Sequence, residues 1–316
     1  GIPPLGRFSK AAAGEGMHAF PKGCDCMRQK KRESMFYLAI LMPALLLLGI
    51  FFVIPVVQSL LLSFTDSYGM RSTYDWIGLS NYVEALGDSS FRDTIQITFT
   101  YTIVTVLGSN LLALVFALIL DGPIRCRNLL RAVFFIPNIM SILVVGYIWR
   151  FVYTSALPDL MTAIGQKTVA VLGKPQSVIY AIALVGIWNT VGYYMVIYIA
   201  SLQSVSEDLT EAARIDGANG WQVLTRIKLP LISPTIVTCI ILCVASAMKT
   251  FELPWTMTSG GPAGASTTMV LKIYNTAFNA NRTGYATAQS TILFVLIASI
   301  SFVLNIIMRR REARLQ

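Results

Sequence analysis

Long stretches without any charged residue constrain the fold of this 316-residue chain more than any other feature. A helix needs about 20 apolar residues to cross roughly 30 Å of hydrocarbon. Six stretches meet this requirement, with 32, 27, 18, 32, 20 and 26 uncharged residues, and they lie between Glu33 and Asp66, Asp93 and Asp121, Arg131 and Arg150, Lys174 and Glu207, Lys228 and Lys249, and Arg282 and Arg309. Each stretch predicts one membrane-spanning helix.

The composition agrees with a membrane protein, since 55% of the residues are hydrophobic and only 13% are charged. Soluble domains carry about 25% charged residues. A transmembrane barrel would alternate apolar and polar residues, whereas these stretches are apolar at consecutive positions. A seventh stretch, between Glu252 and Lys272, is rich in Gly, Ser, Thr and Pro, and we interpret it as a loop in water or inside protein. The prediction is an all-α polytopic membrane protein with six transmembrane helices.

The positions of the basic residues predict the orientation. With the N-terminus inside, 17 of the 25 Lys and Arg residues lie on the inner side, so we expect both termini to be cytoplasmic. The expected organisation is a cytoplasmic tail over 1–34, a transmembrane domain over 35–310 and a cytoplasmic tail over 311–316. Most of the net charge of +9 then comes from basic residues beside the inner ends of the spans, and no nucleic-acid partner is expected.

The connector between the fourth and fifth stretches, residues 204–234, is too long for a simple turn. Its sequence predicts a helix, a turn and a second helix. Ser204 or Ser206 can cap the first helix, and the Gly-Ala-Asn-Gly sequence over 217–220 can reach positive φ and end it. The second helix is expected over 221–228, and Pro230 marks the beginning of the fifth span. By these residues alone, an amphipathic hairpin lying on the membrane surface fits as well.

The connector resembles the EAA loop of ATP-binding cassette importer permeases. The matching residues are Glu211-Ala-Ala-Arg-Ile-Asp-Gly217-Ala-Asn, followed by Ile227-Lys-Leu-Pro230. Other segments resemble the carbohydrate branch of these permeases, the maltose and glycerol-phosphate-like type I group, and they are 76–82, 131–137, 148–150, 200–204 and 258–262. We therefore call residues 204–234 the coupling segment.

The resemblance implies a role for this segment, which in the family docks in a cleft of a cytoplasmic ATPase. It implies that Glu211 and Asp216 make polar contacts with the ATPase, that Gly217 allows the turn, and that Trp221 packs the hairpin with Leu224. The coupling residues implied in this way are Glu211, Ala212, Ala213, Asp216, Gly217, Trp221, Leu224 and Pro230.

The resemblance also implies a location and partners. The location is the bacterial cytoplasmic (inner) membrane. The partners are a second homologous permease subunit, two cytoplasmic ATPase subunits, an extracellular or periplasmic solute-binding protein and membrane lipid. The chain has no Gly-x-x-x-x-Gly-Lys-Ser/Thr phosphate loop. ATP with Mg is thus expected to be used by the partner ATPase, and no cofactor or metal is expected on this chain.

Polar and aromatic residues within the spans are candidates for the substrate pathway, because such residues are costly against lipid. The candidates are Asn138, Trp188, Asn189, Tyr193, Tyr194, Lys249 and Glu252. Each uncharged one can instead hydrogen-bond a neighbouring helix. Lys249 and Glu252, three residues apart, can form a local ion pair or a substrate gate.

The expected function is therefore transport. A permease of this kind translocates a carbohydrate, such as a mono- or oligosaccharide or a related polyol or sugar phosphate, that a solute-binding protein delivers into the cytoplasm. An ion-coupled secondary transporter is the alternative, but it predicts an internal repeat and carboxylates within the spans. An enzyme is not expected, because no nucleophile, histidine base or metal-binding motif stands out.

Overall fold

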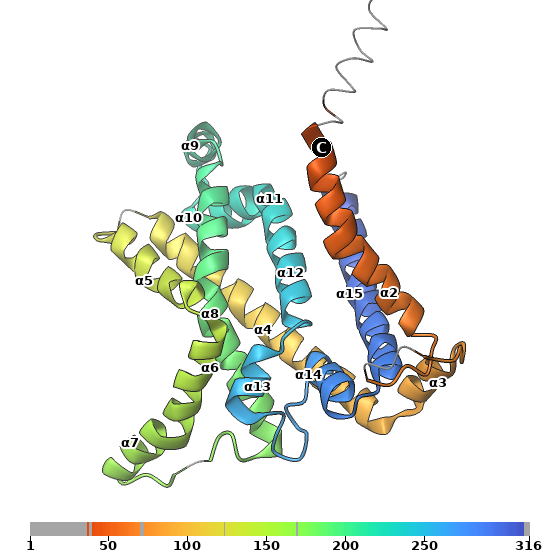
Figure 1. Cartoon of the computed structure of the whole chain (residues 1–316). Coiled ribbons are helices and arrows are strands. Elements are labelled where there is room, and N and C mark those ends of the chain that lie inside the picture. The colour runs from red at the N-terminus through yellow and green to blue at the C-terminus, as the bar shows by residue number, and fades with distance from the viewer. Residues whose placement is uncertain (1–36, 38–39, 70–72, 123, 169, 313–316) are drawn as a thin grey trace, which may run out of the picture. The chain divides into compact units, whose positions relative to one another are not determined.

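A computed structural model describes residues 37, 40–69, 73–122, 124–168 and 170–312 (Figure 1). These residues form helices and no β-strand, which confirms the all-α prediction for this part of the chain. The expected tail over 1–34 and residues 313–316 of the expected C-terminal tail lie outside it. The elements are η1 (Gly49–Val53), α2 (Ile54–Leu62), α3 (Ser80–Gly87), α4 (Ser89–Asp121), α5 (Arg127–Ile139), α6 (Ile142–Phe151), η2 (Val152–Ala156), α7 (Leu157–Ala163), α8 (Pro175–Gln203), α9 (Glu207–Ile215), α10 (Gly220–Val223), η3 (Leu224–Lys228), α11 (Leu229–Leu231), α12 (Ser233–Ala247), α13 (Glu252–Thr258), α14 (Met269–Tyr274), η4 (Asn275–Asn279) and α15 (Thr283–Glu312).

The chain divides into two units, residues 1–58 and 59–316. The described part of the first unit is helical from Ile40, and this helix continues through η1 and α2 to Leu62. Its 23 residues are about 35 Å long at 1.5 Å per residue, enough to cross a bilayer. The first predicted span is therefore a helix of the expected length.

The six predicted spans are of two kinds. Four helices are each long and apolar enough to cross a membrane, namely Ile40–Leu62, α4, α8 and Thr283–Ile307 of α15. The third and fifth predicted spans are bent pairs: Arg127–Ile139 and Ile142–Ala163 meet at 95°, and Gly220–Leu231 and Ser233–Ala247 meet at 63°. At the second break proline lacks an N–H and clashes with the preceding turn, whereas at the first break the backbone leaves the helix at Met140 and Ser141, with ψ of 145° and 126°. Pro137 lies two residues before the end of α5, and Pro230 and Pro234 flank the second break.

Helices α4 and α8 pack along each other and form the largest helix–helix contact of the second unit (Figure 1). Their N-terminal residues line one cavity and their C-terminal residues line another, so the two helices run in the same direction. The segment from α5 to α7 must therefore return the chain from the end of α4 to the beginning of α8. The bent pair Arg127–Ile139 and Ile142–Ala163 therefore forms one span across the membrane.

The seventh stretch is not the simple loop that its composition predicted. Residues 252–258 form α13, which packs against α6, and Leu253 and Met257 are each 2% exposed. A helix satisfies its own backbone, and the surrounding helices cover these apolar side chains. The loop that follows is fixed to α4, since the Met269 N–H donates a 2.9 Å hydrogen bond to Thr98 Oγ1.

The core between α4 and α8 contains polar contacts as well as apolar packing. The hydroxyl of Tyr198 donates a 2.6 Å hydrogen bond to Asn110 Oδ1, and the hydroxyls of Ser109 and Thr190 are 2.9 Å apart. Buried hydroxyl and amide groups that bind across two helices fix their relative position in an apolar environment. Helices α4 and α8 therefore form the frame on which the second unit is built.

Candidate functional site

Three cavities follow one another along the parallel helices α4 and α8. We call them the far cavity, the central cavity and the coupling-side cavity, and their volumes are about 690, 620 and 870 Å³. Helices α4 and α8 both line each cavity. Asp93 and Gln176 line the far cavity, Tyr101 and Asn189 line the central cavity, and Asp121 and Gln203 line the coupling-side cavity. Cavities of these sizes fall in the range of small-molecule sites, about 300–1,000 Å³.

The central cavity collects most of the pathway residues predicted from the sequence. Five of the seven line it, and they are Asn138, Asn189, Tyr194, Lys249 and Glu252. They come from α5, from α8, from the chain after α12 and from the first residue of α13. Residues up to 114 positions apart in sequence thus surround one hollow, with amide, phenol, ammonium and carboxylate groups on its wall.

The other two pathway candidates lie elsewhere on α8. Trp188 is 39% exposed and its ring meets that of Trp149 edge-on, with 5.5 Å between centroids. Tyr193 is 40% exposed and its ring contacts that of Tyr194, with 5.1 Å between the ring centroids. Both are absent from the lining of the central cavity, because the helical twist turns them to a different face of α8.

Asn189 also binds the break between α5 and α6. Its Nδ2 donates a 2.7 Å hydrogen bond to the carbonyl oxygen of Pro137. The last carbonyls of a helix have no partner further along it, so a side chain that binds one of them stabilises the helix end. The alternative interpretation of the spanning polar residues, binding to a neighbouring helix, therefore holds for Asn189, although this residue lines the cavity as well.

The local ion pair between Lys249 and Glu252 is not formed. Among the described residues, ion pairs join Lys228 to Asp121 and Arg282 to Glu84. The interpretation was wrong because α12 ends at Ala247 and α13 begins at Glu252, so the two charged residues do not share a helical face. Both side chains line the central cavity separately.

Sequence reasoning missed the residues of α4 that face the central cavity. Tyr101 and Thr105 line it, and the Thr105 hydroxyl is buried without a hydrogen-bond partner in the described structure. A signal for them exists in the spacing. Asp93, Ile97, Tyr101 and Thr105 are four residues apart and form one stripe along the helix, of which the first two line the far cavity.

The coupling segment has the predicted helix–turn–helix form. Ser206, and not Ser204, caps α9 by accepting a 3.2 Å hydrogen bond from the Asp208 N–H. The turn uses Gly217 at φ 86°, a conformation that glycine adopts without strain. Asn219 and Gln222 then form a capping box at the beginning of α10, with two hydrogen bonds of 2.8 Å.

The coupling residues implied by the resemblance lie mostly on the surface of this segment. Glu211 lines the coupling-side cavity, whose wall also holds Asp121 and Lys228. The expected packing role of Trp221 is wrong, because its side chain is 71% exposed. The residue of α10 that packs inward is Val223, which is 3% exposed. Five of the coupling residues are exposed, namely Glu211, Ala212, Asp216, Gly217 and Trp221. The other three, Ala213, Leu224 and Pro230, are half-buried.

The coupling-side cavity contains an ion pair that sequence reasoning missed. Lys228 Nζ lies 3.2 Å from Asp121 Oδ2, and the side chains are 27% and 18% exposed. The only signal in the sequence is that each residue bounds an uncharged stretch. Within the described part of the chain, no three His, Cys, Asp or Glu side chains gather closely enough to hold a metal ion.

Comparison with known proteins identifies similar chains. Residues 109–316 match the family described as binding-protein-dependent transport system inner membrane component. The probable starch degradation products transport system permease protein AmyD of Thermoanaerobacterium thermosulfurigenes is 31% identical over 90% of this chain and 97% of that protein. The multiple sugar-binding transport system permease protein MsmF of Streptococcus mutans is 32% identical over 81% and 89%. The trehalose/maltose transport system permease protein MalF of Thermococcus litoralis is 30% identical over 87% and 94%.

A solved structure has a similar fold. It is a chain of a bacterial ABC transporter involved in the import of the acidic polysaccharide alginate, with a TM-score of 0.79 over 90% of this chain and 99% of that one. The sequence identity is 24%, so the likeness concerns the fold.

Proposed function

The chain belongs to the family of binding-protein-dependent transport system inner membrane components, the permeases of ABC importers, and on this premise we propose that it translocates a carbohydrate into the cytoplasm. As a member of this family it is a multi-pass membrane transport subunit and not an enzyme. The observation that carries the proposal is the row of three cavities along α4 and α8, with the coupling segment at one end of the row.

The proposed substrate class is a saccharide or a related polyol. The similar proteins AmyD, MsmF and MalF are named for transport of starch degradation products, multiple sugars and trehalose or maltose. The chemistry of the central cavity supports this class. Amide groups such as that of Asn138 can both donate to and accept from sugar hydroxyls, and the Tyr194 side chain offers an apolar ring with a polar tip.

The proposed assembly contains a second homologous permease, two cytoplasmic ATPase subunits and a solute-binding protein outside the membrane. A structure of the alginate transporter in complex with a periplasmic protein bound to an alginate pentasaccharide supports the last of these. ATP with Mg would be used by the ATPase subunits, because this chain has no phosphate loop. We further propose that the coupling segment and both termini face the cytoplasm, so that the far cavity faces outward.

The proposed mechanism moves the coupling segment as a rigid hairpin. Exposed groups on α9 and in the turn, among them Glu211, Asp216 and Gly217, would contact the ATPase. The hairpin continues through Pro230 into α12, whose far end lines the central cavity. Closure of the ATPase would therefore shift α12 against α4 and α8 and change which side the central cavity opens to.

Purification of the full complex tests the proposed assembly. The tagged chain is isolated from its native membrane in mild detergent, and the copurifying proteins are identified by mass spectrometry. We expect an ATPase subunit and a second permease. Uptake of saccharide into vesicles without ATP would instead support an ion-coupled secondary transporter and overturn the proposal.

Substitution of Glu211 tests the coupling role. In reconstituted vesicles, Glu211→Ala should reduce uptake at least tenfold while the amount of assembled complex in the membrane stays the same. Asp208→Ala is the matched control, because this second acid on α9 is exposed and does not line the coupling-side cavity. Equal uptake by the two variants would refute the coupling role of Glu211.

A further inference from the structure

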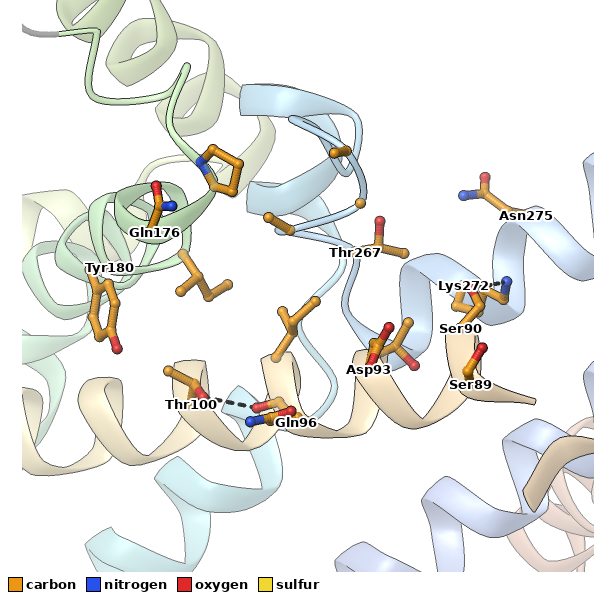
Figure 2. A pocket seen from close by; sticks show the side chains of 17 residues that line it. Ser89, Ser90, Asp93, Gln96, Thr100, Gln176, Tyr180, Thr267, Lys272 and Asn275 are labelled. Atoms are coloured by element: carbon orange, nitrogen blue, oxygen red, sulfur yellow. Dashed lines mark hydrogen bonds between the residues drawn. The ribbon is translucent and has the colours of Figure 1, made fainter. Parts of the chain in front are cut away.

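The far cavity, about 690 Å³ in volume, is a second polar hollow whose lining shares no residue with that of the central cavity. Figure 2 shows that it is walled on three sides, by the first turns of α4, by the beginning of α8, and by the loop before α14 together with α14 and η4. The lining residues labelled in the figure are all polar, and they are Ser89, Ser90, Asp93, Gln96, Thr100, Gln176, Tyr180, Thr267, Lys272 and Asn275.

The chemistry of this wall suits a hydroxyl-rich ligand. Within the described part of the chain, the amides of Gln96 and Gln176 and the carboxylate of Asp93 have no hydrogen-bond or ion-pair partner, so they remain available to a ligand. An amide offers donors and an acceptor side by side, as adjacent sugar hydroxyls require. Tyr180, which is 52% exposed, adds an aromatic ring. Lipid tails would leave these polar groups unsatisfied.

The charges of the wall balance. Asp93 carries one negative charge and Lys272 one positive charge. Lys272 Nζ is held by a 2.8 Å hydrogen bond to Ser90 Oγ (Figure 2). A cavity wall with one charge of each sign has no net attraction for an anionic ligand over a neutral one. The wall therefore suits a neutral saccharide.

The far cavity is aligned with the central one. Asp93 and Ile97 of α4 line the far cavity, and Tyr101 and Thr105 continue the same stripe into the central cavity. One helical turn separates Ile97 from Tyr101, a rise of about 6 Å. A ligand bound in the far cavity would thus reach the central cavity by a short movement along one face of α4.

We propose that the far cavity is a separate substrate subsite, which binds a neutral saccharide before it enters the central cavity. This inference rests on the proposed function, since it assigns to the far cavity the substrate class proposed for transport. Its binding groups are the amides of Gln96 and Gln176, the carboxylate of Asp93 and the ring of Tyr180.

Uptake by the full complex in vesicles is the first test. The probe is whichever of maltose, maltotriose and trehalose the wild-type complex takes up best. The double variant Gln96→Ala/Gln176→Ala should raise the half-saturating probe concentration about tenfold, the factor equivalent to about 1.4 kcal/mol or one good hydrogen bond, and leave the maximal rate unchanged. Gln166→Ala is the matched control, because Gln166 is exposed, precedes α8 and does not line the cavity.

Protection from labelling is the second test, and it reports occupancy directly. In the full complex without ATP or binding protein, the probe should slow the reaction of a maleimide with Gln176→Cys at least fivefold and leave Gln166→Cys unaffected. Suppose that the wild-type complex transports the probe, that the double variant has the same half-saturating concentration as the Gln166→Ala control, and that the probe does not protect Gln176→Cys. The subsite would then be refuted, and the proposed function would stand. If the wild-type complex took up none of the three, and no monosaccharide or polyol either, the proposed function and the subsite would both be wrong.

Discussion

The Lys228 side chain forms an ion pair with Asp121, with 3.2 Å between Nζ and Oδ2. Lys228 is the last residue of η3 in the coupling segment, and Asp121 is the last residue of α4. The C-terminal end of a helix carries partial negative charge, so Asp121 alone would be unfavourable there and the Lys228 cation offsets it. The pair thus joins the coupling segment to α4, one of the two helices that line all three cavities.

Breaking this pair should uncouple ATP use from transport. We expect Lys228→Met and Asp121→Asn each to lower the amount of saccharide transported per ATP hydrolysed at least threefold, because a moving coupling segment would no longer pull α4. The exchange Asp121→Lys/Lys228→Asp should restore part of this ratio. Simultaneous measurement of uptake and phosphate release in vesicles checks it. Arg226→Met is the control, since Arg226 lies on the same element outside both ion pairs of the described residues. Equal losses in all single variants would argue against a specific link.

The sequence was sufficient for the helical class and for the helix–turn–helix form of the coupling segment, because both depend on local signals. Uncharged length predicts a span, and the Gly-Ala-Asn-Gly turn predicts the break after α9. The bend of the third span could not be placed in the same way. Pro137 marks a weak point in α5, but the 95° angle depends on what packs there, including the amide of Asn189 from a helix 52 residues away.

The cavities were likewise only partly predictable. Polarity within a span identified Asn138 and Asn189, whereas Thr105 was overlooked because a threonine in a span usually bonds its own backbone. Lys249 and Glu252 were expected to form a local ion pair or a substrate gate, and the end of α12 at Ala247 keeps their spacing of three residues from placing them on one helical face. Which residues share a hollow depends on long-range packing, which periodicity does not contain.

Asn189 should matter for stability more than its neighbour Asn138. Asn189→Leu removes the 2.7 Å hydrogen bond to the Pro137 carbonyl and leaves that carbonyl without its partner, at a cost of about 1–3 kcal/mol. Asn138→Leu removes no hydrogen bond that the structure contains, so thermal stability should change little. Thermal unfolding of the purified complex in detergent compares them. Equal melting temperatures of the two variants would contradict a structural role for the Asn189 bond.

Gly192 should not tolerate a side chain. A Cβ there would overlap the carbonyl oxygen of Phe134, because α8 and α5 approach each other closely at this point. Gly192→Ala is therefore expected to destabilise the protein by about 1–3 kcal/mol or to reduce its amount in the membrane. At Gly49 an added Cβ meets no atom within 4 Å, so Gly49→Ala serves as the control and should be neutral or slightly stabilising. A Gly192→Ala variant as stable as that control would show that α5 and α8 can separate at no cost.

The ion pair between Arg282 and Glu84 should make stability depend on pH. Two hydrogen bonds of 2.7 Å from the guanidinium lower the pKa of the Glu84 carboxyl below its usual value of 4.5. A carboxyl with a lowered folded-state pKa stabilises the fold above its unfolded-state pKa, and this contribution is lost as the pH falls through the folded-state value.

Wild type should therefore melt above Glu84→Gln at neutral pH, and the two should converge as the pH falls below the lowered folded-state pKa of Glu84. The side chains of Arg282 and Glu84 are 35% and 46% exposed, so the difference should be only about 0.2–1 kcal/mol and should shrink in high salt. Melting curves of both proteins across this pH range measure it. A constant offset at every pH would mean that the substitution acts through packing and not through charge.

The charges of the central cavity should set its preference for neutral over acidic saccharides. Lys249 and Glu252 line the cavity without pairing, and together they leave it with no net charge. Glu252→Gln would give the cavity a net positive charge and should raise uptake of a uronic acid trisaccharide relative to a neutral one, by roughly tenfold for an interaction of about 1.4 kcal/mol. Lys249→Met should shift the ratio the opposite way. Competition between the two trisaccharides in vesicle uptake reports this ratio, and the Glu84→Gln variant, which removes a carboxylate outside the cavity, should leave it unchanged. If all three variants kept the wild-type ratio, the charges at Lys249 and Glu252 would not contact the substrate.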